Sequence, residues 1–290
     1  MENKPVDRFP VVAGYFYPSD PAQLRKIIED SFKHPLGPGK LPQVPESRNK
    51  QSIGFIAPHA GYIYSGPIAA HAYYHMAIEG IPDTIVILGT NHTGLGALVS
   101  VYPAGQWITP LGRLSVDSEL SRGIANNSKF AELDIYAHVE EHSVEVQLPF
   151  IQYIFGDKVK IVPIVIGLHT PEVAEDLARA INDAAEAYSR DIVIVASSDF
   201  NHYDPYEVTI RKDMKAIERI LELDTDGFYK VFLEENISIC GPGAIMTLME
   251  YSKLVGGGDA KAELLKHATS GDTGGDKAAV VGYAAIRFYK

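Results

Sequence analysis

Three histidines lie within a few residues of the end of an apolar run that is typical of a buried β-strand. His59 follows the run 53–57, His92 follows 84–88 and His202 follows 192–196. In an open α/β sheet, ligand sites form beyond the carboxyl ends of the strands. If these three strands are parallel neighbours, their imidazoles meet at one edge of the sheet. Because neutral imidazole is the commonest protein ligand for zinc, copper and iron, the sequence predicts a transition-metal site.

A lone histidine in such a position is more often a hydrogen-bonded turn residue than a ligand. For His59 and His92 together, chain position and residue type favour the same chemistry. We therefore predict that both histidines bind the metal.

Cys240 is the only thiol of the chain and lies just before a helical pattern that begins at residue 243. The dipole and free N–H groups of a helix N-terminus favour the thiolate, which is the form that binds a metal. Free cysteines are also commonly buried as small hydrophobic residues. Spacing alone leaves both roles open. With one cysteine there is no intramolecular disulfide, so the fold does not require an oxidising compartment.

Asp199 and His202 share the turn SSDFNH. A carboxylate three residues from a histidine can fix its tautomer and raise its basicity, which suits proton transfer. The pair is therefore a candidate general acid–base pair. The alternative is an Asx-type turn in which Asp199 only caps the next segment.

His142 and Glu145 are spaced i and i+3 at the start of a predicted helix, 143–155. Residues at this spacing share a helix face, so both side chains can surround a nearby metal. Acidic residues near a helix N-terminus also stabilise the helix without any ligand. The sequence does not separate these two roles.

The remaining patterns describe the elements that must position these residues. Apolar runs at 53–57, 84–88, 161–166, 192–196 and 279–288 predict strands, with a further edge strand at 97–101. Amphipathic patterns predict helices over 20–34, 67–78, 143–155, 171–188, 206–223 and 243–255. Continuous apolar strands alternating with helices indicate an α/β fold, with a central mostly parallel or mixed sheet covered by helices on both faces.

Length and composition are those of an ordinary globular protein. The chain has 290 residues, of which 46% are hydrophobic and 22% charged. The Pro- and Gly-rich stretch 35–51 has little periodicity and reads as a surface connection. We expect residues 1–290 to form a single domain.

The charge balance argues against several kinds of partner. The 37 acidic and 26 basic residues give a net charge of −11, and such a surface repels a phosphate backbone. No apolar run approaches the roughly 20 residues that span a bilayer, and residues 1–10 lack the apolar stretch of a signal peptide. We therefore expect a cytoplasmic protein that binds neither nucleic acid nor membrane.

Several segments match one known family in their order along the chain. They are AGYFY (13–17), APHAGYIYSG (57–66), LGTNH (88–92), EHSVE (141–145), SSDFNH (197–202) and ICG (239–241), and the match extends to the SGD loop at 270–272. With these segments the sequence resembles the Memo family, which is named after a mediator of ErbB2-driven cell motility. The resemblance covers nearly the whole chain.

The resemblance implies the fold of class III extradiol dioxygenases. It also implies a metal set of His59, His92 and Cys240, discussed in the family for iron and for copper. His202 and Asp199 match a pair that lines the same pocket, and Tyr64 matches an aromatic residue at its mouth. Phe16 stands where some members have tryptophan.

One departure bears on the activity. Extradiol dioxygenases of this type use two histidines and a carboxylate, a set suited to Fe(II) and oxygen. A thiolate in the third position shifts the preference toward copper or zinc, so ring opening does not carry over automatically.

We therefore expect a redox enzyme with one transition-metal ion, Fe(II) or copper before zinc, acting on a small molecule. In this scheme His202, oriented by Asp199, is the general acid–base, while His142 and Glu145 tune the surroundings. The alternatives are a non-catalytic module that binds a peptide or protein, and a zinc-dependent hydrolase. A homo-oligomer is possible.

Overall fold

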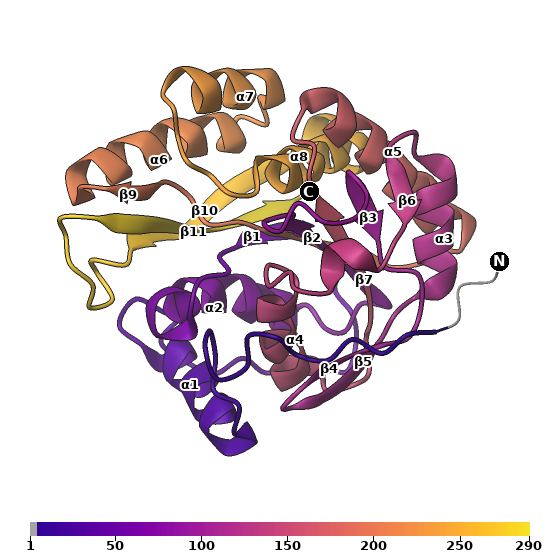
Figure 1. The fold of residues 1–290 in the computed structure, drawn as a ribbon, viewed down its shortest axis with the longest axis horizontal. Helices are drawn as coiled ribbons and strands as arrows, with labels where there is room; N and C mark the ends of the chain where they lie inside the picture. The colour runs from indigo at the N-terminus through magenta and orange to yellow at the C-terminus, as the bar shows by residue number, and fades with distance from the viewer. Residues whose placement is uncertain (1–4) are drawn as a thin grey trace.

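A computed structural model describes residues 5–290, and its centre is a nine-stranded mixed sheet (Figure 1). Eight strands lie in the order β10-β11-β1-β8-β2-β7-β3-β6, and β9 pairs with β11. The strands are β1 (Ser52–Ala57), β2 (Thr84–Thr90), β3 (Val99–Val101), β6 (Ala131–Leu133), β7 (Lys160–Ile166), β8 (Ile192–Ser197), β9 (His202–Asp204), β10 (Lys261–Thr269) and β11 (Val280–Tyr289). A separate hairpin joins β4 (Gln106–Thr109) to β5 (Gly112–Ser115).

The four central strands, β1, β8, β2 and β7, run parallel to one another. On either side the sheet becomes antiparallel, where β11 pairs with β1 and β3 pairs with β7. The prediction of a mostly parallel or mixed sheet is confirmed. The carboxyl ends of β1, β2 and β8 therefore lie at one edge, as the placement of the histidines requires.

Helices cover both faces of this sheet (Figure 1). One face packs against α3 (Ser118–Asn127), α5 (Pro171–Ala187), α6 (Tyr206–Leu221), α7 (Thr225–Glu234) and α8 (Pro242–Gly256). The other packs against α1 (Pro21–Lys33), α2 (Tyr62–Ile78) and α4 (Leu148–Phe155). None of the helices within residues 5–290 combines the length and the apolar character that crossing a bilayer requires.

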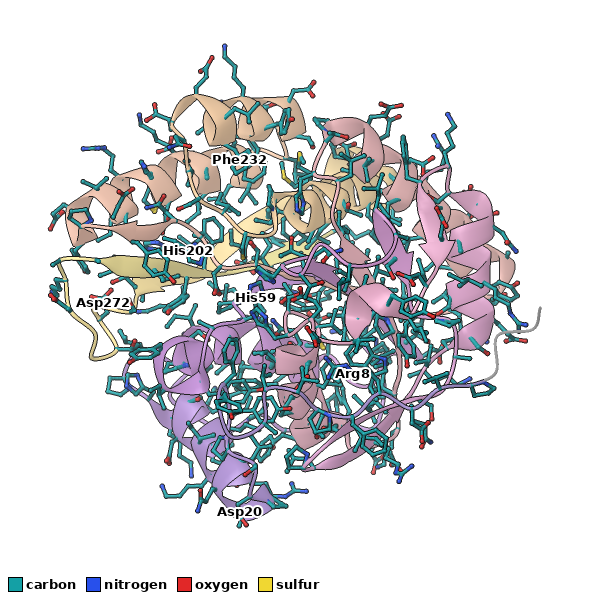
Figure 2. The ribbon with its side chains drawn as sticks, in the orientation of Figure 1. Arg8, Asp20, His59, His202, Phe232 and Asp272 are labelled. Atoms are coloured by element: carbon teal, nitrogen blue, oxygen red, sulfur yellow. The ribbon has the colours of Figure 1, made fainter. Side chains whose placement is uncertain are left out.

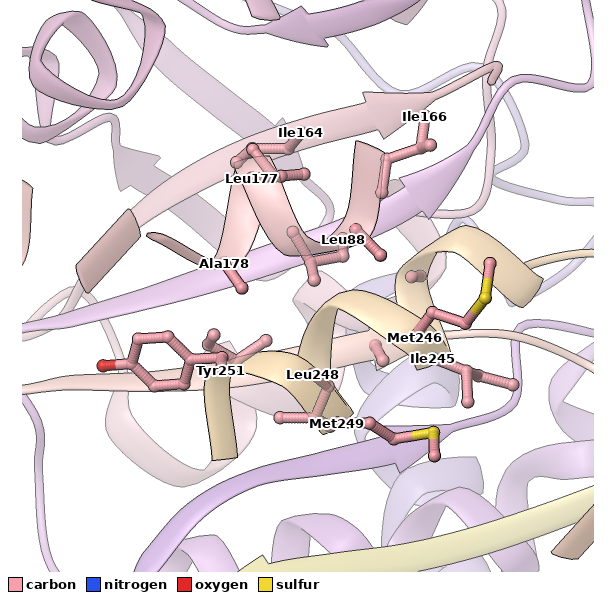
Figure 3. Close-up of a cluster of buried hydrophobic side chains, with 14 of the residues drawn as sticks. Leu88, Ile164, Ile166, Leu177, Ala178, Ile245, Met246, Leu248, Met249 and Tyr251 are labelled. Atoms are coloured by element: carbon pink, nitrogen blue, oxygen red, sulfur yellow. The ribbon is translucent and has the colours of Figure 1, made fainter. Parts of the chain in front are cut away.

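Alternation along the strands explains why they read as continuous apolar runs. In β2, Val86 and Leu88 belong to one hydrophobic core, while Ile85 and Ile87 belong to the other. Figure 3 shows Leu88 with Ile164 and Ile166 of β7, packed against α5 and α8. Successive side chains of a strand point to opposite faces, so a sheet buried on both sides needs apolar residues at every position.

Some elements differ from the sequence prediction. Helix α2 begins at Tyr62 rather than at 67, and Pro67 lies inside it. Because proline is commonest in the first turn of a helix, the sequence prediction placed the helix start at Pro67, five residues too late. The predicted helix 143–155 is a short 3₁₀ turn, Glu145–Gln147, followed by α4. Strand β10 was not predicted, because it is half-buried and has charged residues among its apolar ones.

Candidate metal centre

A cavity of about 490 Å³ opens at the carboxyl edge of the parallel strands. Most of its lining residues lie in the segments that follow β1, β2 and β8 or in loops from other parts of the chain. The lining residues are Phe16, His59, Ala60, Gly61, His92, His142, Asp199, His202, Tyr203, Ser238, Cys240 and Val281. Figure 2 labels His59 near the middle of the molecule and His202 above it, toward the left. The strand ends thus deliver the predicted histidines to a common space.

Three imidazoles meet in this cavity. One ring nitrogen from each of His59, His92 and His142 lies within 4.8 Å of the other two. The ring of His92 stacks on that of His142 at 4.6 Å, and His59 stands edge-on to both, at 5.4 Å from His92 and 5.3 Å from His142. This cluster can hold a metal ion. The sequence had assigned His142 only to the surroundings.

The tautomer of His59 follows from its hydrogen bonds. Its Nδ1 lies 2.9 Å from Ser197 Oγ, which donates its one hydrogen to Ser143 O and accepts from Gln147 Nε2. His59 Nδ1 must therefore be the donor, which leaves the lone pair on Nε2. Burial, and then the neighbouring His92, lowers the pKa of His59 to about 3, so the ring is neutral at physiological pH.

His92 is held by a carboxylate that the sequence analysis did not single out. Glu141 accepts from His92 Nδ1 at 2.8 Å and from the His92 backbone N–H at 2.7 Å. Burial acts to raise the pKa of Glu141, but hydrogen bonds from the His92 ring and from the backbone N–H groups of Ser143 and His92 outweigh it and lower the pKa to about 2. The ionised carboxylate keeps the proton of His92 on Nδ1, so that Nε2 can bind a cation.

His142 completes the cluster from a loop, between the ring of His92 and the ring of Phe16. Phe16 packs edge-on against it at 4.6 Å. Burial, and then His59, lowers the pKa of His142 to about 4. Like His59, this imidazole is neutral at physiological pH and free to donate a lone pair.

Cys240 lies against the cluster, two residues before α8. Its Sγ is 3.1 Å from His59 Nε2 and accepts a hydrogen bond from the backbone N–H of Asp199 at 3.2 Å. Burial raises the pKa of the thiol far above its ordinary value. The sulfur faces Nε2 of His59. The third member of the cluster whose donor atoms lie within 4.8 Å of one another is His142, where the sequence had predicted Cys240.

Asp199 and His202 both line the cavity, but they have different partners from those expected. Asp199 Oδ1 accepts from the backbone N–H of His59 at 2.8 Å, while His202 Nδ1 donates to the carbonyl of Ser238 at 2.8 Å. Between the described residues no hydrogen bond joins Asp199 to His202. The backbone of Ser238 therefore orients His202, correcting the expectation that Asp199 does so. Within residues 5–290, Nε2 of His202 has no hydrogen-bond partner.

The other predicted residues fall into two groups. Phe16 lines the cavity, as expected. Tyr64 is 39% exposed on α2 and Glu145 is fully buried, and neither is among the residues that line the cavity. Glu145 instead pairs with Arg8, and its carboxylate faces the N-terminal segment. The expectation that His142 and Glu145 share a face fails because residue 142 precedes the helical turn.

Sequence reasoning missed the residues that hold the imidazoles in place: Glu141, Ser197 and Ser238. For Glu141 a signal existed, because it stands directly before His142 in a segment quoted for the family resemblance. The same signal existed for Ser197, which opens the quoted segment SSDFNH, whereas Ser238 carried none, since its partner His202 is 36 residues away along the chain.

These features define an α/β protein with a histidine-rich site, able to hold a metal ion, at the carboxyl edge of its parallel strands. The family model described as "Memo-like protein" matches residues 8–287. The chain belongs to this family.

Relatives of similar length support the assignment. A "MEMO1 family protein" from Desulfurococcus amylolyticus is 64% identical over 282 residues, covering 97% of this chain and 99% of the relative. Proteins described in the same words from Ignicoccus hospitalis and Sulfurisphaera tokodaii are 54% and 53% identical, again over 97% of this chain and 98% and 99% of theirs. The resemblance inferred from the sequence motifs is confirmed.

Proposed function

We propose that the chain is a redox enzyme that uses one transition-metal ion, iron(II) or copper, and acts on a small molecule in the cavity. The observation that carries the proposal is the meeting of three imidazole nitrogens within 4.8 Å. His59, His92 and His142 would supply these nitrogens, and Cys240 would add a sulfur beside His59. Such an ion supplies Lewis-acid and electron-transfer chemistry.

The donor set fits a transition metal by its protonation state. Ser197 and Glu141 accept hydrogen bonds from Nδ1 of His59 and His92, so Nε2 is the atom of each ring that is placed to bind a cation. The low pKa values of His59 and His142 keep these rings neutral at pH 7. A neutral imidazole can bind a cation without first losing a proton.

His202 is the proposed general acid–base of the reaction. Its Nδ1 donates to the carbonyl of Ser238, which fixes the orientation of the ring, and the residue lines the cavity. A group held in this way can take a proton from a bound substrate and return it later. Asp199 accepts a hydrogen bond from the backbone N–H of His59 and so helps to hold that residue in place.

The same donors favour a second candidate, a zinc-dependent hydrolase. Three histidines with an open cavity in front of them are the donor set of one class of catalytic zinc site, in which the fourth position holds water. The cavity of about 490 Å³ leaves room for both water and a substrate. The third candidate, a module that binds a peptide or protein without turnover, needs no metal.

The proposed setting is cytoplasmic, with a small molecule or peptide as ligand and neither nucleic acid nor membrane as partner. The net charge of −11 supports the exclusion of nucleic acid. A homo-oligomer is compatible with the proposal, and sedimentation of the purified chain tests it.

Metal content after purification without a histidine tag tests the site. We expect about one transition-metal ion per chain in the wild type, and a loss of most of it in His59→Ala, His92→Ala and His142→Ala. His71→Ala is the matched control, because His71 lies on α2 and bonds to Leu36 O outside the cavity. Metal retained by all three site variants, with the fold intact, would contradict the proposal.

Reconstitution separates the three candidate functions. Oxygen uptake with catechol by protein loaded with Fe(II) or Cu(I) under anaerobic conditions would support the redox enzyme. Ester hydrolysis that appears only with Zn(II) would support the hydrolase. Peptide binding that is equal with and without metal, with no turnover in either assay, would support the binding module.

A further inference from the structure

A buried ion pair lies behind the loop that carries Glu141 and His142. Arg8 is 5% exposed and Glu145 is fully buried, and their side chains are in direct contact. Removing two charges from water has a large desolvation cost, so a buried pair is weak evidence for stability and is better explained by the conformation that it specifies. The partners of this pair show which conformation that is.

Arg8 fixes the loop at several points at once. Its Nε donates to the carbonyl of His138 at 3.1 Å, and its Nη2 donates to the carbonyl of Glu141 at 2.7 Å. The guanidinium also lies over the ring of Trp107, 4.7 Å from the ring centre. One rigid, planar group therefore holds the backbone of residues 138–141, including the residue whose carboxylate orients His92.

Glu145 holds a second segment, residues 6–17, which we call the N-terminal strap. Its carboxylate accepts from the backbone N–H groups of Val11 and Val12 at 3.0 Å each, and from the hydroxyl of Tyr17 at 2.7 Å. Between these anchors the strap turns and places the ring of Phe16 on His142. In Figure 2, Arg8 of this strap is labelled below and to the right of His59, on the side opposite His202.

Two imidazoles of the candidate centre thus depend on this ion pair through different contacts. His92 depends on it through Glu141, and His142 depends on it through its place in the loop and through Phe16. We propose that the Arg8–Glu145 pair is a positioning element of the metal centre, and that its loss weakens metal binding although no donor atom is removed. The proposal rests on the proposed metal site.

Metal affinity of two conservative variants tests the proposal. Arg8→Lys keeps the charge but cannot reach the carbonyl of Glu141 and the carboxylate of Glu145 together, and Glu145→Gln keeps the size but removes the charge. We expect each to bind Co(II) on the order of tenfold more weakly, in competition with a chelator, with an altered visible spectrum of the bound ion. The measurement is made well below the unfolding temperature of each variant.

Arg113→Gln is the matched control. Arg113 makes an exposed ion pair with Asp7 of the same strap, away from the loop, so Co(II) affinity and spectrum should not change. Wild-type affinity and spectrum in folded Arg8→Lys and Glu145→Gln would overturn the proposal, as would an equal loss in Arg113→Gln. If both variants fail to fold, Tyr17→Phe removes only one bond to Glu145, and a loss of about twofold or more is expected. No loss would then refute the positioning role.

Imidazole spectra of the metal-free protein keep this inference distinct from the proposed function. Long-range ¹H–¹⁵N NMR spectra report which ring nitrogen carries the proton. We expect His92 to hold its proton on Nδ1 in the wild type, and to lose this single tautomer in Arg8→Lys. If the wild type binds no metal, the proposed function fails, while unchanged His92 spectra in the variant would refute the positioning role by themselves.

Discussion

The imidazoles of the centre are fixed by hydrogen-bond acceptors that lie on other strands and loops. Ser197 accepts a hydrogen bond from Nδ1 of His59, and Glu141 accepts one from Nδ1 of His92, so Nε2 of each ring is turned toward the cluster. Burial keeps His59 and His142 uncharged. The rings of His59 and His92 are therefore already oriented for a cation, while the Cys240 thiol beside His59 Nε2 would still have to give up its proton or move aside.

Glu141→Gln tests the acceptor that holds His92. The amide keeps the shape of the carboxylate but loses its charge, so it holds the Nδ1 proton less firmly. We expect metal affinity to fall by about 10- to 100-fold, measured by competition with a chelator. Glu140→Gln is the control, because the neighbouring Glu140 is exposed, and it should bind as the wild type does. Equal affinity in the two variants would contradict the role of Glu141.

Cys240 can be tested through the proton that it carries. Burial raises the pKa of its thiol, so the metal-free site holds the protonated form at pH 7, and coordination must release that proton. Metal binding by the wild type should therefore release about one proton more than binding by Cys240→Ala, and its advantage in affinity should grow as pH rises. Calorimetry in buffers of different ionisation enthalpy measures this release. Equal release would remove Cys240 from the ligand set.

At the scale of residues, the sequence indicated His59 and His92 because both follow strand ends where sites form, and the family resemblance added Cys240. The sequence placed His142 only nearby, and it paired His202 with Asp199 because the two are close along the chain. In the structure the partner of His202 is Ser238, 36 residues away. Hydrogen bonds between distant segments produce no periodic pattern in the sequence, so they cannot be predicted from it.

At the scale of elements, helix α8 links the core to the site. It begins at Pro242, two residues after Cys240, and packs against β1, β2 and β8 (Figure 3). The close approach requires glycine at position 54 of β1. A Cβ there would lie 2.6 Å from both the carbonyl of Ile194 and a methyl group of Leu248.

Gly54→Ala should therefore destabilise the fold and displace the start of α8. We expect a loss of about 1–3 kcal/mol in the free energy of unfolding, measured by urea denaturation, since overpacking forces neighbours apart. Gly258→Ala is the control, because a Cβ at position 258 meets no atom within 4 Å. A Gly54 variant as stable as the wild type would show that the sheet and α8 can separate without cost.

The central strands, which apolar runs predicted, are buried on two faces. β1, β2, β7 and β8 read as apolar runs because each contributes to both cores. The missed elements, such as β10 and the β4–β5 hairpin, are half-buried or short, so tertiary contacts rather than local pattern decide their conformation.

At the scale of the whole molecule, folding keeps several histidines neutral that would charge in the unfolded chain. His138 is an example outside the centre. It is fully buried, its Nε2 donates to the carbonyl of Ser100, and burial is the main cause that lowers its pKa from 6.5 to about 3. The unfolded chain therefore binds a proton at this residue over a pH range in which the folded chain does not.

The sign of the pH dependence follows. Above pH 6.5, His138 is neutral in both the folded and the unfolded chain, so its contribution to the free energy of unfolding does not change with pH. As pH falls from 6.5 toward 3, the unfolded state is favoured by about 1.4 kcal/mol for each pH unit. His138→Gln should remove this share of the slope, measured by urea denaturation between pH 4 and pH 7. A variant with the wild-type slope would show that His138 already carries its proton in the fold.

The central claim is that segments far apart in the sequence bring the imidazoles of His59, His92 and His142 to one metal ion. Anomalous diffraction from crystals of the metal-loaded protein tests it most directly. We predict one peak in the cavity, about 2.1 Å from a nitrogen of each of the three rings. A peak bound elsewhere, or three rings turned away from one another around an ion held by other residues, would contradict the account.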